Sequence, residues 1–492
     1  MDELRETHIS RVLLKGDRAY KIKKPVTLPF LDYGTLERRL GFCRDEVRLN
    51  RRLAPDVYRG VRALVPAPEG LRVADEAAPG AVEYVVEMRR YDEDATLARR
   101  LDAGAAGERE VRAVGERLAA FHAAAVRPAE PERAVPALEA MVAENFATLR
   151  ELHVEDERLT DSQALASAFL TGRRAELLDR AAAGLVRDGH GDLRAEHVVL
   201  ERGIEIVDCV EFDPALREID VGLDLAFLVM DLLRRDERLA RALVSAYREA
   251  GGDPGDDALV AFFAAQRALI RAKVALLRAG QVDERDAARR RADAAALLGL
   301  GQRLGWRVRL GSLVIVCGPA ASGKSTLAAA LAERAGAALL SSDLVRKALV
   351  GVAPTERAPE DAYAPEVNRR TYAALGRRAR ECIVHGRPVV VDATFRYRAD
   401  RRAFTAELGA DPLWVECRAP AAVRARRAAV RAARADAVSD ADAAVAILQE
   451  SEWETLDAAP ERRLEIRTDR GSGAVLTAVR EALDARLRAA PR

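Results

Sequence analysis

The sequence predicts an α+β domain followed by an α/β domain with a parallel sheet. A chain of 492 residues is too long for one ordinary hydrophobic core. In residues 1–300, short strand patterns come first and mostly helical patterns follow. In residues 308–492, apolar runs that end in polar residues alternate with helical patterns, which favours a parallel sheet. We expect a connector between Gly301 and Gly311.

Composition excludes several classes of protein. The 79 basic and 78 acidic residues leave a net charge of +1, so nothing favours a nucleic-acid or membrane partner. No apolar run approaches the length of a membrane span, and the first residues are acidic and polar, unlike a secretory signal. The five scattered cysteines fit a reduced protein. We therefore expect a cytoplasmic protein, whose oligomeric state the sequence does not indicate.

The N-terminal domain begins with a predicted hairpin. Residues 9–14 and 19–26 read as strands, and the Gly-Asp pair between them favours a tight turn. Because side chains alternate along a strand, Lys21 and Lys23 share one face of the second strand. Helical periodicity follows over 35–53, with Glu46 near its middle.

Two aspartates downstream have the spacing of a phosphotransfer centre. Asp192 lies in the run His-Gly-Asp, and Asp208 follows sixteen residues later at the end of an apolar strand pattern. A kinase needs one aspartate to accept the proton of the acceptor hydroxyl and a second to hold Mg²⁺ between phosphates. The order of lysine strand, glutamate helix, first aspartate and second aspartate matches the protein-kinase template.

On these motifs, with Asp224-Leu-Ala downstream, residues 1–300 resemble the aminoglycoside phosphotransferase family, a branch of the protein-kinase-like fold. The resemblance implies that Asp192 is the general base and Asp208 the principal Mg²⁺ ligand. Either Lys21 or Lys23 would contact the α- and β-phosphates of ATP. Glu46 would pair with that lysine, although a solvated helix glutamate is the alternative.

One residue departs from the family pattern. His197 occupies the second metal-ligand position, where the family usually carries Asn. Imidazole is a poor ligand for a hard cation such as Mg²⁺. The domain could use one metal, substitute Glu196 or another group, or be slow or inactive. We expect His197 to brace the loop that holds Asp192.

The C-terminal domain begins with a phosphate-binding motif. The apolar run 313–316 leads into Gly-x-x-x-x-Gly-Lys-Ser, and a helical pattern follows. Its glycines let backbone N–H groups point at a phosphate, and the helix directs its positive end at the same anion. Lys324 should reach the β- and γ-phosphates, and the Ser325 hydroxyl should bind Mg²⁺. The predicted nucleotide-binding residues are Gly318, Pro319, Ala320, Ala321, Ser322, Gly323, Lys324, Ser325 and Thr326.

Two further strand ends carry acidic residues. Asp343 follows the strand pattern 338–340, and Asp392 follows 388–391. Ligands of open α/β sheets bind at the carboxyl ends of strands. Asp392 is therefore a second candidate Mg²⁺ ligand of this domain, beside Ser325. An arginine-rich helical pattern begins after a strand at 413–417.

With these motifs the C-terminal domain resembles P-loop NTPases of the AAA-like kinase group, including gluconate-kinase-like, zeta-toxin-like, chloramphenicol-phosphotransferase-like and polynucleotide-kinase-like proteins. The resemblance implies that Asp343 is the general base, with a helix N-cap as the alternative role. Arg346 would clamp substrate or phosphate. Arg427 and Arg431 would be lid residues that neutralise transition-state charge.

The sequence as a whole predicts ATP- and Mg²⁺-dependent phosphoryl transfer to a hydroxyl of a small molecule. One rival function is phosphorylation of a nucleic-acid 5′-hydroxyl or a nucleotide-sugar by the C-terminal domain, although the balanced charge makes nucleic acid the weaker candidate. Another is an ATP-dependent switch that phosphorylates nothing. A switch needs no hydroxyl-activating base at Asp343, so this residue distinguishes the two classes.

Overall fold

The computed structural model describes residues 3–6, 9–28, 31–152, 154, 156–409, 412–432 and 452–489. The chain forms two compact units by its internal contacts. One consists of Met1–Asn145 with Ala175–Ile270, and the other of Phe146–Arg174 with Arg271–Arg492.

The first unit is built on an antiparallel sheet, in the strand order β1-β2-β3-β8-β6-β7. Its hairpin β2–β3 agrees with the sequence prediction, whereas the hairpin β6–β7 has no clear signal in the sequence. The strands are β1 (Glu3–Glu6), β2 (Ser10–Lys15), β3 (Arg18–Lys23), β6 (Tyr58–Ala67), β7 (Gly70–Asp75) and β8 (Glu83–Arg89).

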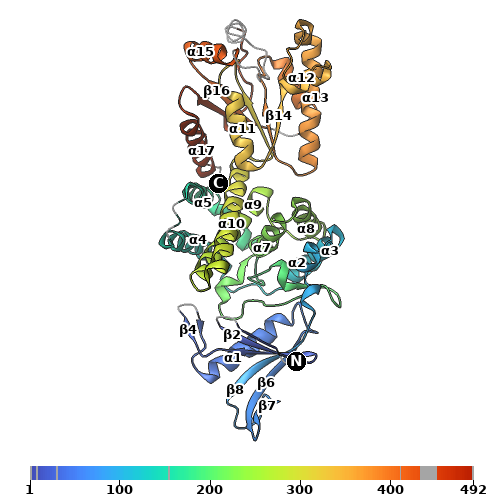
Figure 1. The fold of residues 1–492 in the computed structure, drawn as a ribbon, viewed down its shortest axis with the longest axis vertical. Coiled ribbons are helices and arrows are strands. Elements are labelled where there is room, and N and C mark those ends of the chain that lie inside the picture. Colours follow the sequence, from blue (N-terminus) through green and yellow to red (C-terminus); the bar gives the residue numbers. More distant parts are fainter. Residues whose placement is uncertain are drawn as a thin grey trace. The chain divides into compact units, whose positions relative to one another are not determined.

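Helix α1 (Leu36–Asn50) packs on this sheet against β8 and β6 (Figure 1). Cys43 and Val47 of the helix join Val61 and Val86 of the strands in one buried cluster. The same inward-facing side of α1 carries Glu46, which is fully buried, so the helix presents a carboxylate to the sheet. The alternative of a solvated glutamate at this position is wrong.

Helices and short strand pairs form the rest of the first unit. The buried helix α7 carries Asp224 in its first turn, as its apolar sequence predicts. The helices are α2 (Leu97–Asp102), α3 (Glu108–Ala124), α4 (Ala134–Glu151), α6 (Arg174–Ala182), α7 (Val221–Leu233), α8 (Glu237–Glu249) and α9 (Asp257–Ala279). Residues 146–151 of α4, residue 174 of α6 and residues 271–279 of α9 are counted with the second unit. The short pairs are β4 (Thr27–Leu28) with β5 (Leu31–Asp32), β9 (Val186–Asp188) with β12 (Glu218–Asp220), and β10 (Val198–Val199) with β11 (Glu205–Ile206).

The second unit contains a parallel sheet in the order β14-β15-β13-β16-β17. With the antiparallel sheet and helices of the first unit, this confirms the predicted α+β and α/β fold classes. The strands are β13 (Leu313–Cys317), β14 (Ala338–Ser341), β15 (Val389–Asp392), β16 (Leu413–Arg418) and β17 (Arg463–Arg467).

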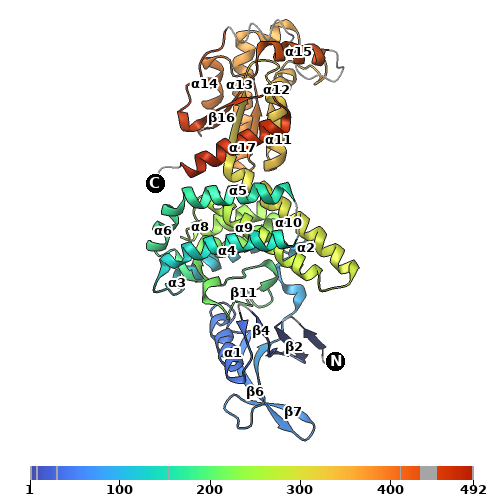
Figure 2. The same ribbon diagram turned by 90° about the vertical axis from the view of Figure 1, so that its left-hand side faces the viewer.

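Helices cover both faces of the parallel sheet. On one face, α11 and α17 pack over Val314, Val415 and Ile466, and on the other α13 and α14 pack over Ile315 and Val391. Figures 1 and 2 show the sheet between these layers. The helices are α11 (Lys324–Ala335), α12 (Ser342–Leu349), α13 (Pro365–Val384), α14 (Arg398–Thr405), α15 (Ala421–Ala432) and α17 (Ser472–Arg488).

The second unit also includes two helices that precede the parallel sheet in sequence, α5 (Glu157–Gly172) and α10 (Glu284–Leu310). The buried Arg309 of α10 pairs with Asp484 of α17 at 2.7 Å and with Asp161 of α5 at 2.9 Å. The predicted connector from Gly301 to Gly311 is wrong, because helix α10 continues to Leu310, where Trp306 and Leu310 enter the core. The division into domains 1–300 and 308–492 stays a prediction.

Within the described ranges, no helix is long and apolar enough to cross a bilayer.

Candidate active sites

In the first unit, one lysine joins two predicted site residues. Lys21 on β3 places its Nζ 2.8 Å from Glu46 Oε1 and 2.8 Å from Asp208 Oδ1. The three groups come from a strand, a helix and a loop that are far apart in sequence. Lys21 remains partly accessible, with 15% of its side chain exposed, and Asp208 is half exposed. A nucleotide phosphate can therefore reach this lysine and this carboxylate.

Lys23 lies on the same face of β3 and is buried. Its Nζ lies 2.8 Å from Glu46 Oε2 and also donates to Glu211 and to the Tyr33 hydroxyl. Only 1% of its side chain is exposed. The geometry therefore favours Lys21 as the phosphate lysine and gives Lys23 the role of holding Glu46 in place.

The paired charges set the ionisation of this centre. The Lys21 ammonium holds the pKa of Asp208 well below its usual range, even though burial acts in the opposite direction. Burial alone would raise the pKa of Glu46, but the neighbouring Lys21 and Lys23 lower it. Both carboxylates are therefore charged at neutral pH, as phosphate and Mg²⁺ binding require.

The loop that carries Asp192 is held by Asp224. The backbone N–H groups of His190 and Gly191 donate to Asp224 at 2.7 and 2.8 Å. His122 Nε2 lies 3.0 Å from the same carboxylate. Burial alone would raise the pKa of Asp224, but the hydrogen bond from His122 and its other partners lower it. Asp224 thus fixes the backbone just before Asp192.

His197 contacts the predicted base Asp192 and lies near the predicted Mg²⁺ ligand Asp208. Its Nδ1 donates to the backbone oxygen of Asp192 at 2.8 Å, because a carbonyl can only accept. Its Nε2 lies 3.8 Å from Asp208 Oδ2. The first contact is the bracing interaction expected of this residue, and the second leaves the other ring nitrogen facing the metal-ligand position.

The phosphate-binding loop of the second unit follows β13 and leads into α11. Gly318 has φ 143°, and a Cβ there would lie 2.6 Å from the backbone oxygen of Cys417. Gly323 has φ 90° and occupies the N-cap of α11. Lys324 and Ser325 therefore begin the helix, where free N–H groups favour a bound anion.

A cavity of about 770 Å³ lies over this loop, lined by Lys324, Ser325, Asp392 and Asp343 among others. Asp392 is buried at the end of β15, and burial raises the pKa of its carboxyl, while nearby Lys324 and a hydrogen bond to Ser325 act against the rise. Within the described part of the chain, Asp392 Oδ1 has no hydrogen-bond partner.

Asp343 lies in the first turn of α12, and Ser341 occupies the N-cap, so the N-cap alternative for Asp343 is wrong. Arg427 also lines the cavity, and its guanidinium donates to the Thr468 backbone oxygen. A Cβ placed on Gly323 of the phosphate loop would lie 3.2 Å from this guanidinium, so Arg427 lies beside the loop. A base candidate and a cation are thus both present beside the phosphate loop.

Two predicted residues are not placed at this cavity. Arg346 points into the interior, where it donates to Ala362 O at 2.8 Å and to Asn368 Oδ1 at 2.6 Å. Its guanidinium stacks on Tyr363. Arg346 is therefore not among the residues that line the cavity, and its role as a clamp stays a prediction. The side chain of Arg431 lies outside the described residues.

The sequence did not assign roles to several residues of these sites. His122 supports Asp224 from α3, and Thr468 bonds the Ser322 backbone oxygen from beyond β17. Neither residue belongs to a local motif, so the sequence contains no signal that pairs it with its partner.

Mg²⁺ fits the donors of both sites. Within the described ranges, no cluster of three or more His, Cys, Asp or Glu side chains could hold a metal ion. Mg²⁺ commonly takes one or two carboxylates and completes its shell with substrate phosphates and water. Asp208 in the first unit and Asp392 with Ser325 in the second offer such partial sets, and the unpartnered Asp392 oxygen is suited to this role.

Comparison with known proteins gives matches over both parts of the chain. A family model described as an AAA domain matches residues 313–456. The uncharacterized protein Rv2004c of Mycobacterium tuberculosis (strain ATCC 25618 / H37Rv) is 34% identical over 469 residues, which cover 92% of this chain and 91% of that protein.

Solved structures match separate parts of the chain. A gluconokinase from Sinorhizobium meliloti 1021 is 21% identical and covers 37% of this chain and 95% of its own, with a TM-score of 0.28. The GDP and kanamycin complex of APH(2″)-IIIa is 15% identical and covers 61% of this chain and 92% of its own, with a TM-score of 0.36.

Proposed function

We propose that this chain, which belongs to the same family as the mycobacterial protein Rv2004c, is an ATP- and Mg²⁺-dependent phosphotransferase acting on a hydroxyl of a small molecule. The match of residues 313–456 to an AAA domain supports this proposal. The contact of Lys21 with both Glu46 and Asp208, beside the braced Asp192 loop, carries this proposal. Four distant segments supply the groups that a phosphoryl-transfer centre needs.

In the first unit, Lys21 would hold the phosphates of ATP, and Asp192 would orient the acceptor hydroxyl. The hydroxyl oxygen attacks the γ-phosphorus and its proton passes to the Asp192 carboxylate. The bond from the γ-phosphorus to the bridging oxygen breaks, and ADP leaves with the electron pair. Bound Mg²⁺, held by Asp208, would neutralise phosphate charge. Asp224 and His197 keep Asp192 in position.

The cavity of the second unit would bind a second nucleotide through the loop 318–326, with Mg²⁺ at Ser325 and Asp392. Its volume of about 770 Å³ leaves room for an acceptor beside the nucleotide. Asp343 would be the base there and Arg427 would neutralise developing charge. The balanced charge of the chain favours small molecules over nucleic acid as acceptors at either site.

Phosphate transfer from radiolabelled ATP to a metabolite pool tests the proposal on the full chain. Variants Asp192→Asn and Lys324→Ala each disable one site, and the double variant disables both. We expect labelled product with the wild type and with at least one single variant, and none with the double variant. ATP hydrolysis without any labelled acceptor would overturn the proposal in favour of an ATP-dependent switch.

Nucleotide binding supplies an independent check. Titration calorimetry should give two ATP sites per chain for the wild type and one for Lys324→Ala, because that substitution removes the lysine of the phosphate loop. Unchanged stoichiometry and affinity in this variant would contradict the role of the loop.

A further inference from the structure

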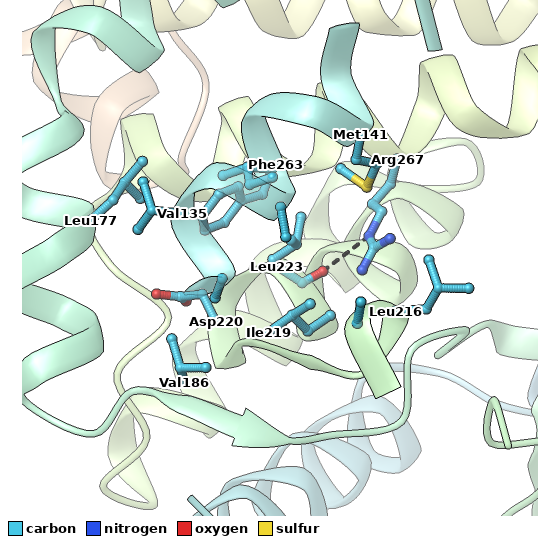
Figure 3. Close-up of a pocket in the computed structure, with 14 residues that line it drawn as sticks. Val135, Met141, Leu177, Val186, Leu216, Ile219, Asp220, Leu223, Phe263 and Arg267 are labelled. Atoms are coloured by element: carbon cyan, nitrogen blue, oxygen red, sulfur yellow. Dashed lines mark hydrogen bonds between the residues drawn. The ribbon is translucent and has the colours of Figure 1, made fainter. Parts of the chain in front are cut away.

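The first unit contains a cavity that the proposed chemistry does not yet use. Its volume is about 100 Å³, and its walls come from α4, α6, β9, the turn Pro214–Leu216, β12, α7 and α9. Figure 3 shows Val135, Leu177, Ile219 and Phe263 around it. Among the lining residues, Asp220 and Arg267 alone carry charge. The cavity is thus an apolar space with a polar edge.

Asp220 is already neutralised. Arg180 donates to its two carboxylate oxygens at 2.8 and 2.9 Å, and the N–H of Gly222 donates to one of them at 2.7 Å. This carboxylate is therefore committed to the fold. The charge of the cavity available to a ligand is that of Arg267.

Arg267 is buried, with 4% of the residue exposed. Its Nε donates to the backbone oxygen of Leu223 at 3.1 Å, the contact drawn in Figure 3, and its guanidinium stacks on Phe227 at 4.1 Å. A terminal nitrogen, Nη2, has no hydrogen-bond partner among the described residues. Burial lowers the pKa of Arg267 to about 10, so it remains a cation at neutral pH. A buried cation with an unused donor is costly unless an anion completes it.

The cavity adjoins the loop that carries Asp192. The N–H of Gly189 donates to the backbone oxygen of Arg217 at 2.8 Å, just beyond the turn that forms one wall. A Cβ on Gly191 would lie 2.9 Å from the backbone oxygen of Leu216, which lines the cavity. The negative charges of Asp224 and Asp192 also act on Arg267. The cationic edge and the proposed base therefore belong to one region of the unit.

We propose that this cavity binds part of the phosphoryl acceptor of the first unit and that the acceptor is a small aliphatic hydroxy acid. Its carboxylate would pair with Arg267, its short alkyl group would fill the apolar space, and its hydroxyl would meet Asp192. This inference rests on the proposed function. The volume limits the alkyl group, since a dry cavity of about 150 Å³ holds benzene and this one is smaller.

The step balances with ATP as the phosphoryl donor. The hydroxyl oxygen of the acid forms the new bond to the γ-phosphorus, the bond to the bridging oxygen breaks, and the proton passes to Asp192. The carboxylate stays on Arg267 throughout, so the products are a phosphorylated acid and ADP.

Ligand binding tests the cavity without requiring turnover. Isovalerate and its neutral amide, isovaleramide, are titrated by saturation-transfer NMR against the full chain that carries Lys324→Ala. We expect isovalerate to bind at least about tenfold more tightly than the amide, because a charge-assisted hydrogen bond is lost. Arg267→Gln should remove this preference, and Arg267→Lys should restore part of it.

A matched pair of variants on α4 locates the binding. Ala137 lines the cavity, whereas Ala140 is exposed on the same helix and does not. Ala137→Phe should abolish isovalerate binding and Ala140→Phe should leave it unchanged, with thermal unfolding confirming that both fold. No carboxylate binding by the parent protein, or binding that survives Ala137→Phe, would overturn the inference.

Transfer to 2-hydroxyisovalerate separates this inference from the proposed function. Asp192→Asn should keep isovalerate binding and lose transfer. If carboxylates bind but no acceptor is ever phosphorylated, the proposed function fails and the cavity remains an anion site without a kinase role. If other acceptors are phosphorylated and Ala137→Phe has no effect on them, the inference about the acceptor alone is wrong.

Discussion

The two units hold their functional carboxylates in opposite electrostatic states. In the first, Asp208, Glu46 and Asp224 are paired with lysine or histidine, and their pKa values are lowered. In the second, burial raises the pKa of Asp392, and it also raises that of Asp400, a buried residue of α14 outside the proposed site. The first centre pairs its carboxylates with cations or hydrogen-bond donors, whereas Asp392 of the second keeps one buried oxygen without a hydrogen-bond partner among the described residues.

This difference implies two ways of binding a nucleotide. In the first unit, Lys21 already contacts Asp208, so a phosphate bound there as proposed would exchange one ionic contact for another. In the second, the cavity is lined by Lys324, by Ser325 at the start of α11 and by Asp392, whose buried Oδ1 has no hydrogen-bond partner among the described residues. A ligand that partners the buried Asp392 oxygen would offset the cost of leaving it without a hydrogen bond, which should favour tight binding.

The largest expected effect concerns the first unit, where Asp208 is paired with Lys21. Asp208→Ala should reduce transfer by the first unit about 10³-fold or more, because the transition state loses its main anionic support for the metal. Turnover is measured with Lys324→Ala present, so that the phosphate loop does not contribute. Near-normal activity in this background would show that the Lys21–Asp208 pair is structural.

The next test concerns the cavity of the second unit, which Asp343 lines. Asp343→Asn should lower transfer by the second unit about 10²-fold, the loss expected of a general base, and leave ATP affinity unchanged. Asp192→Asn provides the background, and calorimetry measures the affinity. A variant that retains full transfer would reduce Asp343 to a residue of the first helical turn.

Replacing one buried aspartate in each unit by asparagine should change the free energy of unfolding in opposite directions. Asp224→Asn should destabilise the protein by about 2–3 kcal/mol at pH 7, because charged hydrogen bonds to the Asp192 loop are lost. Asp400→Asn should stabilise it by about 1–2 kcal/mol, because burial disfavours the Asp400 carboxylate more than the nearby Arg346, Arg396 and Arg401 favour it, and the amide carries no charge. Thermal unfolding at pH 7 measures both changes.

The pH dependence gives the sign of the Asp400 effect. Burial raises the pKa of Asp400 to about 6, above the unfolded value of about 3.9, so the folded state binds more protons. Its contribution to stability is fully present below about pH 3.9 and is lost as the pH rises through about 6. The gain from Asp400→Asn should therefore be seen at pH 7 and vanish at pH 4. An equal gain at both values would exclude titration of Asp400 as its cause.

The smallest expected effect concerns the bracing histidine. His197→Asn should leave transfer by the first unit within about threefold or raise it, since an amide oxygen suits Mg²⁺ better than imidazole. The same Lys324→Ala background applies. Complete loss of activity would mean that the Nδ1 contact with the Asp192 backbone is indispensable.

The fold classes and the phosphate loop could be predicted because their signals are local. The loop 318–326 works through backbone groups of consecutive residues, so its spacing in the sequence is also its geometry. Strand-end acids such as Asp343 and Asp392 follow from the rule that parallel strands end at one edge. The connector at 301–311 could not be predicted, because buried contacts of Trp306 and Leu310 extend α10 through it.

The sequence by itself determined which residues are chemically able to act, namely the lysines of β3, the aspartates 192, 208, 343 and 392, and the phosphate loop. Only the tertiary structure distinguished Lys21, which is partly exposed, from the buried Lys23, since period-two alternation places both on one face. It also turned Arg346 inward and placed Arg267 at the edge of a cavity beside the Asp192 loop. These outcomes depend on contacts between segments distant in sequence, which no local pattern encodes.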